Sequence, residues 1–180
     1  MWNALRRLNA WGAKHPRALG SISGAGLGGA GDLASQRLER AERADIWRSS
    51  LVSLWYASSA WFFWAPFLAW QARAFGESGL ASLACKVATF NAAVATFDIT
   101  GFHLVAMAPR VGLDEALRAL REGYFQTVAV GWSLWTPGMA VVYRVMPPHL
   151  QMPSAYTLDV LWACALSYMS NTAREAGRSS

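Results

Sequence analysis

The sequence predicts an all-α fold: a polytopic membrane helical bundle of four spans, preceded by a glycine-rich helix that is a candidate fifth span. Three observations carry this prediction. The chain is 54% hydrophobic and only 15% charged, long stretches contain no charge at all, and small residues recur every four positions near the start. Soluble domains usually contain about 25% charged residues. We expect residues 1–180 to form a single integral-membrane helical domain.

Four stretches are long enough to cross a bilayer as a helix, which takes roughly 20 residues: 49–72, 87–109, 123–143 and 154–173. The first and third contain no Asp, Glu, Lys, Arg or His. The second is interrupted only by Asp98 and His103, and the fourth only by Asp159. A soluble helical protein with a large core is the alternative, but uncharged runs of this length leave no face for solvent.

A ladder of residues spaced by four precedes these spans: Gly20, Gly24, Gly28, Asp32 and Gln36. On a helix this spacing places all five along one stripe. In lipid, such small residues let two helices approach closely and associate through van der Waals contact. In water, each glycine would destabilise a helix by up to about 1 kcal/mol relative to alanine. We therefore expect this helix to pack against the bundle by its glycine stripe.

Length alone does not make the glycine-rich helix a span, because its uncharged run covers only 18–31. The basic residues help to decide. If the helix does not cross, 13 of them lie on one side of a four-span bundle and 2, Arg73 and Arg144, on the other; if it crosses, the split is 9 against 6. The positive-inside preference favours the first arrangement. A tilted or partly inserted helix remains open.

The first 17 residues form a basic amphipathic N-terminus. Before Asp32 there are four basic residues and no acidic one, and apolar residues recur every three positions at Trp2, Leu5, Leu8 and Trp11. This composition is typical of a mitochondrial address. A basic helix lying on anionic lipid is an equally good interpretation.

Motifs for catalysis or metal binding are weak. His15, His103 and His149 lack metal-ligand spacing with one another and with the cysteines. A G-x-G-x-x-G match across 26–31 is not preceded by a strand, so it does not indicate dinucleotide binding. We expect no enzymatic activity, no metal, no cofactor and no nucleic-acid partner. The expected partners are the lipid bilayer and either a second copy of the chain or a larger membrane complex.

Polar residues inside the spans are costly and therefore point to function. One face of the third segment carries a polar seam: Lys86, Thr89, Thr96, Thr100 and His103. In the next span, Gln126, Ser133 and Arg144 fall within a narrow arc, as does Pro137. Such seams could line an aqueous path, or their hydroxyls could bond back to their own helix. Asp98 lies on the opposite side from the Lys86 seam without an obvious partner, and we take it as the leading functional residue.

Arg144 and Asp159 flank the short proline-rich connection around Pro147, Pro148 and Pro153 at similar distances. Two antiparallel helices joined there would set these side chains at comparable depth. We therefore expect a structural ion pair between them.

Several of these residues form motifs of a known family. His15 and Pro16, a glycine-rich stretch that ends in Gly31 and Asp32, and Gln36 resemble the opening of the Mpv-seventeen family, also called the twenty-two-kilodalton peroxisomal membrane protein family. Further positions resemble its later motifs: Trp64, Pro66, Trp70, Lys86, Leu134, Trp135, Tyr143, Met146, Pro147, Trp162 and 168–170. The resemblance covers nearly the whole chain. It implies a membrane protein of the mitochondrial inner membrane or, alternatively, the peroxisomal membrane, linked to small-molecule permeation.

The chain also departs from the family pattern, and the departures remove polar groups. An Asp-Gln pair after the lysine becomes Phe90-Asn91, and polar positions of the C-terminal signature fall on Met139 and Val142. Two hypotheses follow. The first is a channel-like or permeability-modulating protein for small solutes, whose path uses Asp98 and the two seams. The second is a non-catalytic structural accessory subunit of a larger mitochondrial membrane complex.

Overall fold

The computed structural model describes residues 2–38, 43–76 and 78–162, and every regular element in these ranges is a helix, which confirms the all-α prediction. The elements follow one another along the chain: α1 (Trp2–Lys14), α2 (Pro16–Leu38), α3 (Ile46–Ser59), η1 (Ala60–Trp64), α4 (Ala65–Phe75), α5 (Leu80–Ala93), η2 (Val94–Asp98), α6 (Ile99–Phe102), η3 (His103–Met107), α7 (Ala108–Val111), α8 (Leu113–Val145) and a last helix over 148–162. The η segments are π-helical. They interrupt two long continuous helices, over 46–75 and 80–111.

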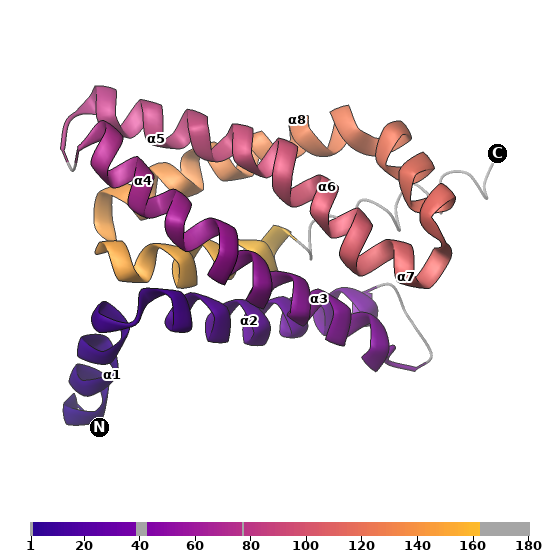
Figure 1. The fold of residues 1–180 in the computed structure, drawn as a ribbon, viewed down its shortest axis with the longest axis horizontal. Helices are drawn as coiled ribbons and strands as arrows, with labels where there is room; N and C mark the ends of the chain where they lie inside the picture. The colour runs from indigo at the N-terminus through magenta and orange to yellow at the C-terminus, as the bar shows by residue number, and fades with distance from the viewer. Residues whose placement is uncertain (1, 39–42, 77, 163–180) are drawn as a thin grey trace.

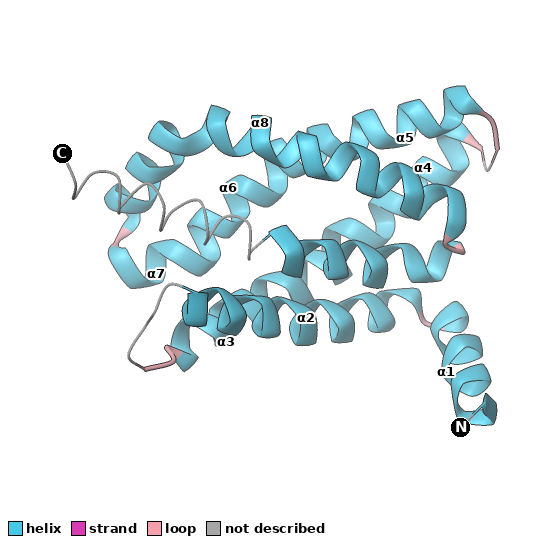
Figure 2. Cartoon of the chain, turned by 180° about the vertical axis from the view of Figure 1, so that it is seen from behind, coloured by secondary structure: helices cyan, strands magenta, loops and turns pink. Residues whose placement is uncertain are grey.

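The helices form an elongated bundle (Figure 1). α2 and the last helix run along one side, the two long helices cross the bundle diagonally, and α8 lies behind them, as the reverse view shows (Figure 2). α1 turns away from the bundle at His15. The main hydrophobic core fills the space between α4, α5, α8 and the last helix, with Trp64, Phe90, Trp135 and Tyr156 at its centre.

Glycines make the tight connections between the long helices. Gly76 and Gly79 bound the turn between α4 and α5, and Gly112 joins α7 to α8, all three with positive φ of 74°, 102° and 91°. Side chains strongly disfavour this backbone region, whereas glycine adopts it freely. The three long segments can therefore fold back on one another within very few residues.

The glycine stripe of α2 lies against the bundle. Gly20, Gly24, Gly28, Asp32 and Gln36 are all buried. A Cβ added at Gly24 would lie 2.9 Å from the backbone oxygen of Tyr56, and one at Gly28 would lie 2.5 Å from the Tyr56 ring. The backbones of α2 and α3 therefore approach each other so closely that a side chain at Gly24 or Gly28 would collide with Tyr56.

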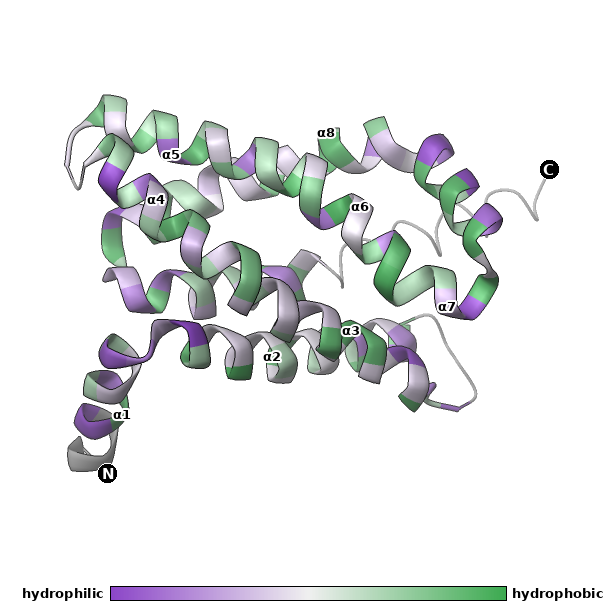
Figure 3. Ribbon diagram, viewed as in Figure 1, coloured by the Kyte–Doolittle hydropathy of each residue, from purple (hydrophilic) through white to green (hydrophobic). Residues whose placement is uncertain are grey.

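Only one helix in the described part of the chain, the stretch Leu80–Val111, is both long enough and apolar enough to qualify as a membrane span by length and hydropathy. The four-span arrangement is thus not confirmed as such. The segments 49–72 and 123–143 are helical as expected, while the segment 154–173 continues beyond the described residues. Hydrophilic residues gather on α1 and near the turn between α7 and α8, and apolar residues dominate the middle of the bundle (Figure 3).

Candidate functional site

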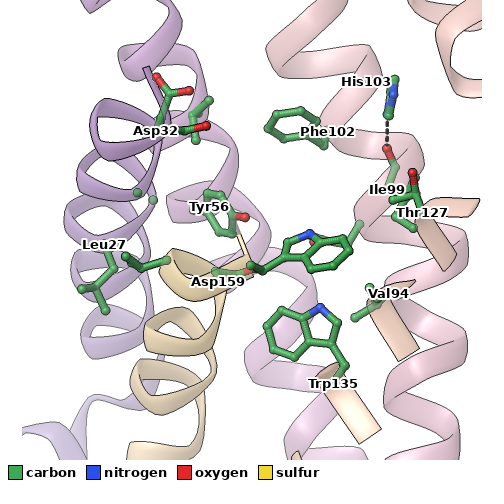
Figure 4. A pocket seen from close by; sticks show the side chains of 18 of the residues that line it. Leu27, Asp32, Tyr56, Val94, Ile99, Phe102, His103, Thr127, Trp135 and Asp159 are labelled. Atoms are coloured by element: carbon green, nitrogen blue, oxygen red, sulfur yellow. Dashed lines mark hydrogen bonds between the residues drawn. The ribbon is translucent and has the colours of Figure 1, made fainter. Parts of the chain in front are cut away.

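A cavity of about 360 Å³ opens inside the bundle, between α2, α3, the stretch from η2 to η3, α8 and the last helix (Figure 4). Its walls are largely apolar and aromatic, from Tyr56, Phe102 and Trp135 among others. Three carboxylates also line it, those of Asp32, Asp98 and Asp159. A volume of this size, walled by apolar groups with a few polar ones, is typical of a small-molecule site.

Asp98 lies at the end of η2, and its Oδ1 atom is buried without a hydrogen-bond partner among the described residues. The indoles of Trp55 and Trp64 lie beside this carboxylate. The indole nitrogen of Trp55 is likewise buried without an acceptor. Buried polar atoms are nearly always hydrogen-bonded, to protein or to ordered water, so this corner of the cavity has the polarity to hold water.

Asp159 approaches the same cavity from the last helix. Figure 4 shows its carboxylate and the Tyr56 ring on the same wall, and the Tyr56 hydroxyl lies next to Asp159. Asp98 and Asp159 are close enough for their charges to interact. The cavity therefore brings two carboxyl groups together among aromatic rings.

Asp32 sits at one end of the cavity in a network of hydrogen bonds. Its two carboxylate oxygens accept from Arg48 Nε at 2.6 Å and from Ser49 Oγ at 2.7 Å, and Gln36 Nε2 donates to it at 2.7 Å. This cluster ties α2 to the first turn of α3. The charge of Asp32 is thus paired with Arg48, whereas Asp98 has no ion pair among the described residues.

Two π-helical segments flank the acidic part of the cavity. η1 and η2 pack against each other, with the rings of Phe63 and Phe97 stacked 3.7 Å apart between centroids. π-helical turns are rare and occur frequently at functional sites. Each takes more residues per turn than an α-helix, so each rotates the residues that follow it.

The seam predicted along one face of the third segment is divided between two cavities. His103 lines the acidic cavity, the one that contains Asp98 and Asp159, and its Nδ1 donates to the Ile99 carbonyl at 2.8 Å. Lys86 instead faces a second cavity at the other end of the bundle. Thr96 is exposed and donates to the Ala92 carbonyl at 2.8 Å, while Thr100 is half-buried and does not line either cavity.

Thr89 bonds to its own helix and to α4. Its hydroxyl donates to the Cys85 carbonyl at 2.7 Å and accepts from Gln71 Nε2 at 2.7 Å. The predicted seam is therefore not one continuous lining. Asp98, predicted to lie on the opposite side from the seam, shares its cavity with His103.

Gln126 and Ser133 require a correction, because both are exposed on the outer face of α8. Ser133 donates to the Val130 carbonyl at 2.7 Å. The inner face of α8 is set by Gly131, Trp135 and Met139, and positions 126 and 133 fall about half a turn away from Trp135. They do not line the path that the sequence predicts.

The predicted ion pair between Arg144 and Asp159 is also wrong. Arg144 is exposed near the end of α8, whereas Asp159 faces the interior cavity. The last helix resumes at residue 148, directly after a two-residue break. Asp159 is consequently about three turns from the connection, while Arg144 lies within the last turn before it.

Sequence reasoning missed the most buried polar side chain of the long helix over 46–75. Gln71 is 1% exposed. Its amide donates to the Lys86 carbonyl at 2.9 Å, and its Oε1 accepts from the Tyr143 hydroxyl at 2.6 Å. The signal was present, because Gln71 is the one amide in the uncharged run 49–72.

The main core separates the acidic cavity from the second cavity. Trp64, Phe90, Trp135, Met139 and Tyr156 belong to it, each no more than 4% exposed. Trp135 lines the acidic cavity from this side, and Met152, at the edge of the same core, lines the second cavity. In this conformation the two cavities do not join.

Comparison with known proteins gives matches over most of the chain. The sequence model of the Mpv17 / PMP22 family matches residues 107–167. "PXMP2/4 family protein 2" of Dictyostelium discoideum is 23% identical over 167 residues, which cover 87% of this chain and 85% of that protein. "Protein SYM1" of Yarrowia lipolytica is 25% identical over 174 residues, 91% of this chain and 79% of that protein. No solved structure matches the chain.

Proposed function

Because this chain belongs to the Mpv17 / PMP22 family, a family of membrane proteins, we propose that it is a multi-pass organelle membrane protein whose acidic cavity forms part of a path for small solutes. We assign it to the mitochondrial inner membrane, with the peroxisomal membrane as the alternative. Its role in this proposal is channel-like or permeability-modulating and involves no catalysis.

The Asp98 carboxylate carries the proposal, because its buried Oδ1 has no hydrogen-bond partner among the described residues. A carboxylate surrounded by hydrocarbon is expensive, and acidic residues in membrane segments usually face a water-filled cavity or a partner. Asp98 lines the cavity together with Asp159, and its Oδ1 has no hydrogen-bond donor among the described residues. A polar solute or water would supply the missing donor. Two carboxylates in one cavity favour cations over anions.

The described conformation is closed. The aromatic and methionine core around Trp64, Trp135 and Met139 separates the acidic cavity from the opposite end of the bundle. Conduction therefore requires these side chains to move, and the π-helical segments η1 and η2 lie next to them. π-helical turns lack regular α-helical bonding and occur frequently at functional sites, so this change takes place at η1 and η2.

Reconstituted vesicles test this proposal directly. Wild-type protein should raise the flux of small cations above that of protein-free vesicles, and Asp98→Asn should reduce the preference for cations while the fold is retained. Asp114→Asn removes the same charge from an exposed position in the first turn of α8 and is the matched control. Wild-type vesicles no leakier than empty ones, across small cations, anions and metabolites, would contradict the channel proposal.

The closed core favours a second candidate, a structural accessory subunit of a larger mitochondrial membrane complex. Large apolar side chains are exposed on the outside, among them Phe62 at 79% and Phe125 at 82% exposure. Lipid or a protein partner could cover them. Comigration with a large complex in mild detergent, together with zero flux, would support this candidate, whereas a free protein that conducts would exclude it.

A further inference from the structure

A second cavity of about 440 Å³ lies at the end of the bundle where α1 meets α2. Side chains from α4, α5, the end of α8 and the start of the last helix line it. Lys86 and His149 are its basic residues, and no aspartate or glutamate is among the described residues that line it. Its polarity is thus the reverse of that of the acidic cavity.

Lys86 is a buried basic residue without a counter-ion among the described residues. It is 8% exposed and lines this cavity, but no carboxylate or other hydrogen-bond acceptor among the described residues binds its ammonium group. The contact that the structure gives is a cation–π one, with Nζ 6.0 Å from the centroid of the Tyr143 ring. Such a contact is weak at this distance, and lysines are almost never so buried without a counter-ion.

The surrounding groups hold Lys86 and its neighbours in place. Tyr143 donates to Gln71, and Gln71 in turn donates to the Lys86 carbonyl, so the ring and the backbone at Lys86 are fixed relative to each other. His149 is tied through Nε2 to Asn9 Oδ1 of α1 at 2.7 Å. The amide of Gln151 has only a long bond of 3.4 Å to the Met146 carbonyl.

The dipoles of the helices that end near this cavity do not provide a counter-charge for Lys86. The starts of α2, α5 and the last helix meet the ends of α1, α4 and α8 at this end of the bundle, so their dipoles largely cancel. Lys86 therefore sets the sign of the cavity. Ammonium and amide groups around a cavity of this size match a compact oxyanion such as a phosphate or a carboxylate.

We propose that this cavity is an oxyanion-binding site in which Lys86 is the principal counter-charge. The ligand is a phosphate-type anion, either free in solution or carried by a lipid headgroup. The site is separated from Asp98 by the main core and does not depend on the proposed conduction.

The chain provides a matched pair of variants, because Lys86 and Lys14 are its two lysines. Lys14 lies in the last turn of α1, at the same end of the bundle, and is exposed. Lys86→Met and Lys14→Met remove the same charge from the same side chain. General attraction of anions to a basic protein should fall equally in both, whereas binding in the cavity should fall only in Lys86→Met.

Thermal unfolding in non-ionic detergent is measured with inorganic phosphate, against chloride at equal ionic strength, and with micelles that contain phosphatidylglycerol. Saturating anion should raise the unfolding temperature of wild type and Lys14→Met by about 5 °C, because a ligand that binds only the folded state stabilises it. Lys86→Met should show no rise, and its ligand-free unfolding temperature should stay close to that of wild type, since the ammonium group makes no ion pair among the described residues.

The measurements with phosphate and with phosphatidylglycerol identify the source of the anion. A Lys86-dependent rise with phosphate indicates a free anion, and one seen only with phosphatidylglycerol indicates a lipid headgroup. Selective isotope labelling of lysine gives an independent readout, because the two side chains yield two signals and only that of Lys86 should shift on titration. No Lys86-dependent rise in either arm, or an equal loss in Lys14→Met, would overturn the proposal.

Discussion

The side chain of Gln36 holds the backbone of Asp45 at both of its polar groups. Gln36 Oε1 accepts from the Asp45 N–H at 2.6 Å, and Gln36 Nε2 donates to the Asp45 carbonyl at 3.1 Å. The amide of Gln36 thus pairs with the peptide groups of Asp45 as a neighbouring strand would. Asp45 in turn caps α3, since its carboxylate accepts from the Arg48 N–H at 2.9 Å. The end of α2 therefore fixes where α3 begins.

Gln36→Leu should destabilise the protein by about 2 kcal/mol. The substitution leaves the Asp45 N–H and carbonyl without their side-chain partners and also removes donors to Asp32 and Ser49. Gln126→Leu is the control, because Gln126 is exposed on α8. Unfolding in detergent as a function of denaturant measures both. Equal effects at the two positions would show that the pairing with Asp45 contributes nothing.

Alanine substitutions along α2 should show how much of the stability depends on the close contacts of the glycine stripe and how much on the higher helix propensity of alanine. At Gly24 the new Cβ would lie 2.9 Å from the backbone oxygen of Tyr56 and 3.0 Å from the Tyr156 ring. We expect Gly24→Ala to cost about 1–3 kcal/mol, because a backbone oxygen and a buried ring give little room to adjust.

Gly26→Ala is the matched control on the same helix, since a Cβ there meets nothing within 4 Å. Its effect should be neutral or stabilising, by up to about 1 kcal/mol. Thermal unfolding of both variants in one detergent decides the question. A stable Gly24→Ala would mean that α2 packs elsewhere than the described contact with α3.

Asp45 should make stability depend on pH in the acidic range. The Arg48 backbone N–H donates to its carboxylate and, with Arg110 at 2.8 Å, lowers the pKa of Asp45 below its ordinary value of 3.8, although partial burial opposes this. Because the folded pKa is the lower one, this stabilisation is fully present above about pH 3.8 and is lost as the pH falls through the folded pKa.

Asp45→Asn should flatten this part of the stability profile while the helix cap is kept, because asparagine is also a good N-cap residue. The unfolding temperature of wild type minus that of the variant should shrink as the pH is lowered below 3.8. Asp114→Asn serves as the exposed control. A wild-type advantage that stays constant across this range would show that Asp45 does not titrate differently in the folded state.

The stripe on α2 could be read from the sequence because α2 is a regular α-helix over its whole length. A step of four advances about 40° around a helix, so the stripe winds slowly along α2, and no break shifts its register. Gly20, Gly28 and Gln36 are all buried. The family resemblance and the all-helical fold were likewise predictable, because they depend on motifs and on hydrophobic runs that survive local irregularity.

The lining of the cavities could not be read in the same way. The π-helical segments η2 and η3 carry no recognisable sequence signal, and each shifts the register of the residues that follow. Lys86 and His103 are also about 25 Å apart along the helix, and they line different cavities. The pairing of Arg144 with Asp159 failed for another reason, since it assumed a longer connection than the two-residue break that forms.

Tyr143 and Gln71 should show energetic coupling across the bundle. Tyr143→Phe removes the hydroxyl that donates to Gln71 Oε1 at 2.6 Å and leaves this oxygen buried, so we expect a loss of about 1–2 kcal/mol. Gln71→Leu removes the bonds to Lys86 and Thr89 as well and should cost more.

The double variant should be less destabilised than the sum of the two single ones, by on the order of 1 kcal/mol, because the orphaned oxygen disappears together with its donor. Tyr124→Phe is the matched control: its hydroxyl donates at 3.0 Å to the Ala95 carbonyl, far from Gln71. Its effect should add to that of Gln71→Leu without coupling. Free energies of unfolding for the four Tyr143 and Gln71 combinations give the coupling directly. A value near zero would mean that this bond does not hold α4 against α8, and that the wall of the Lys86 cavity has some other support.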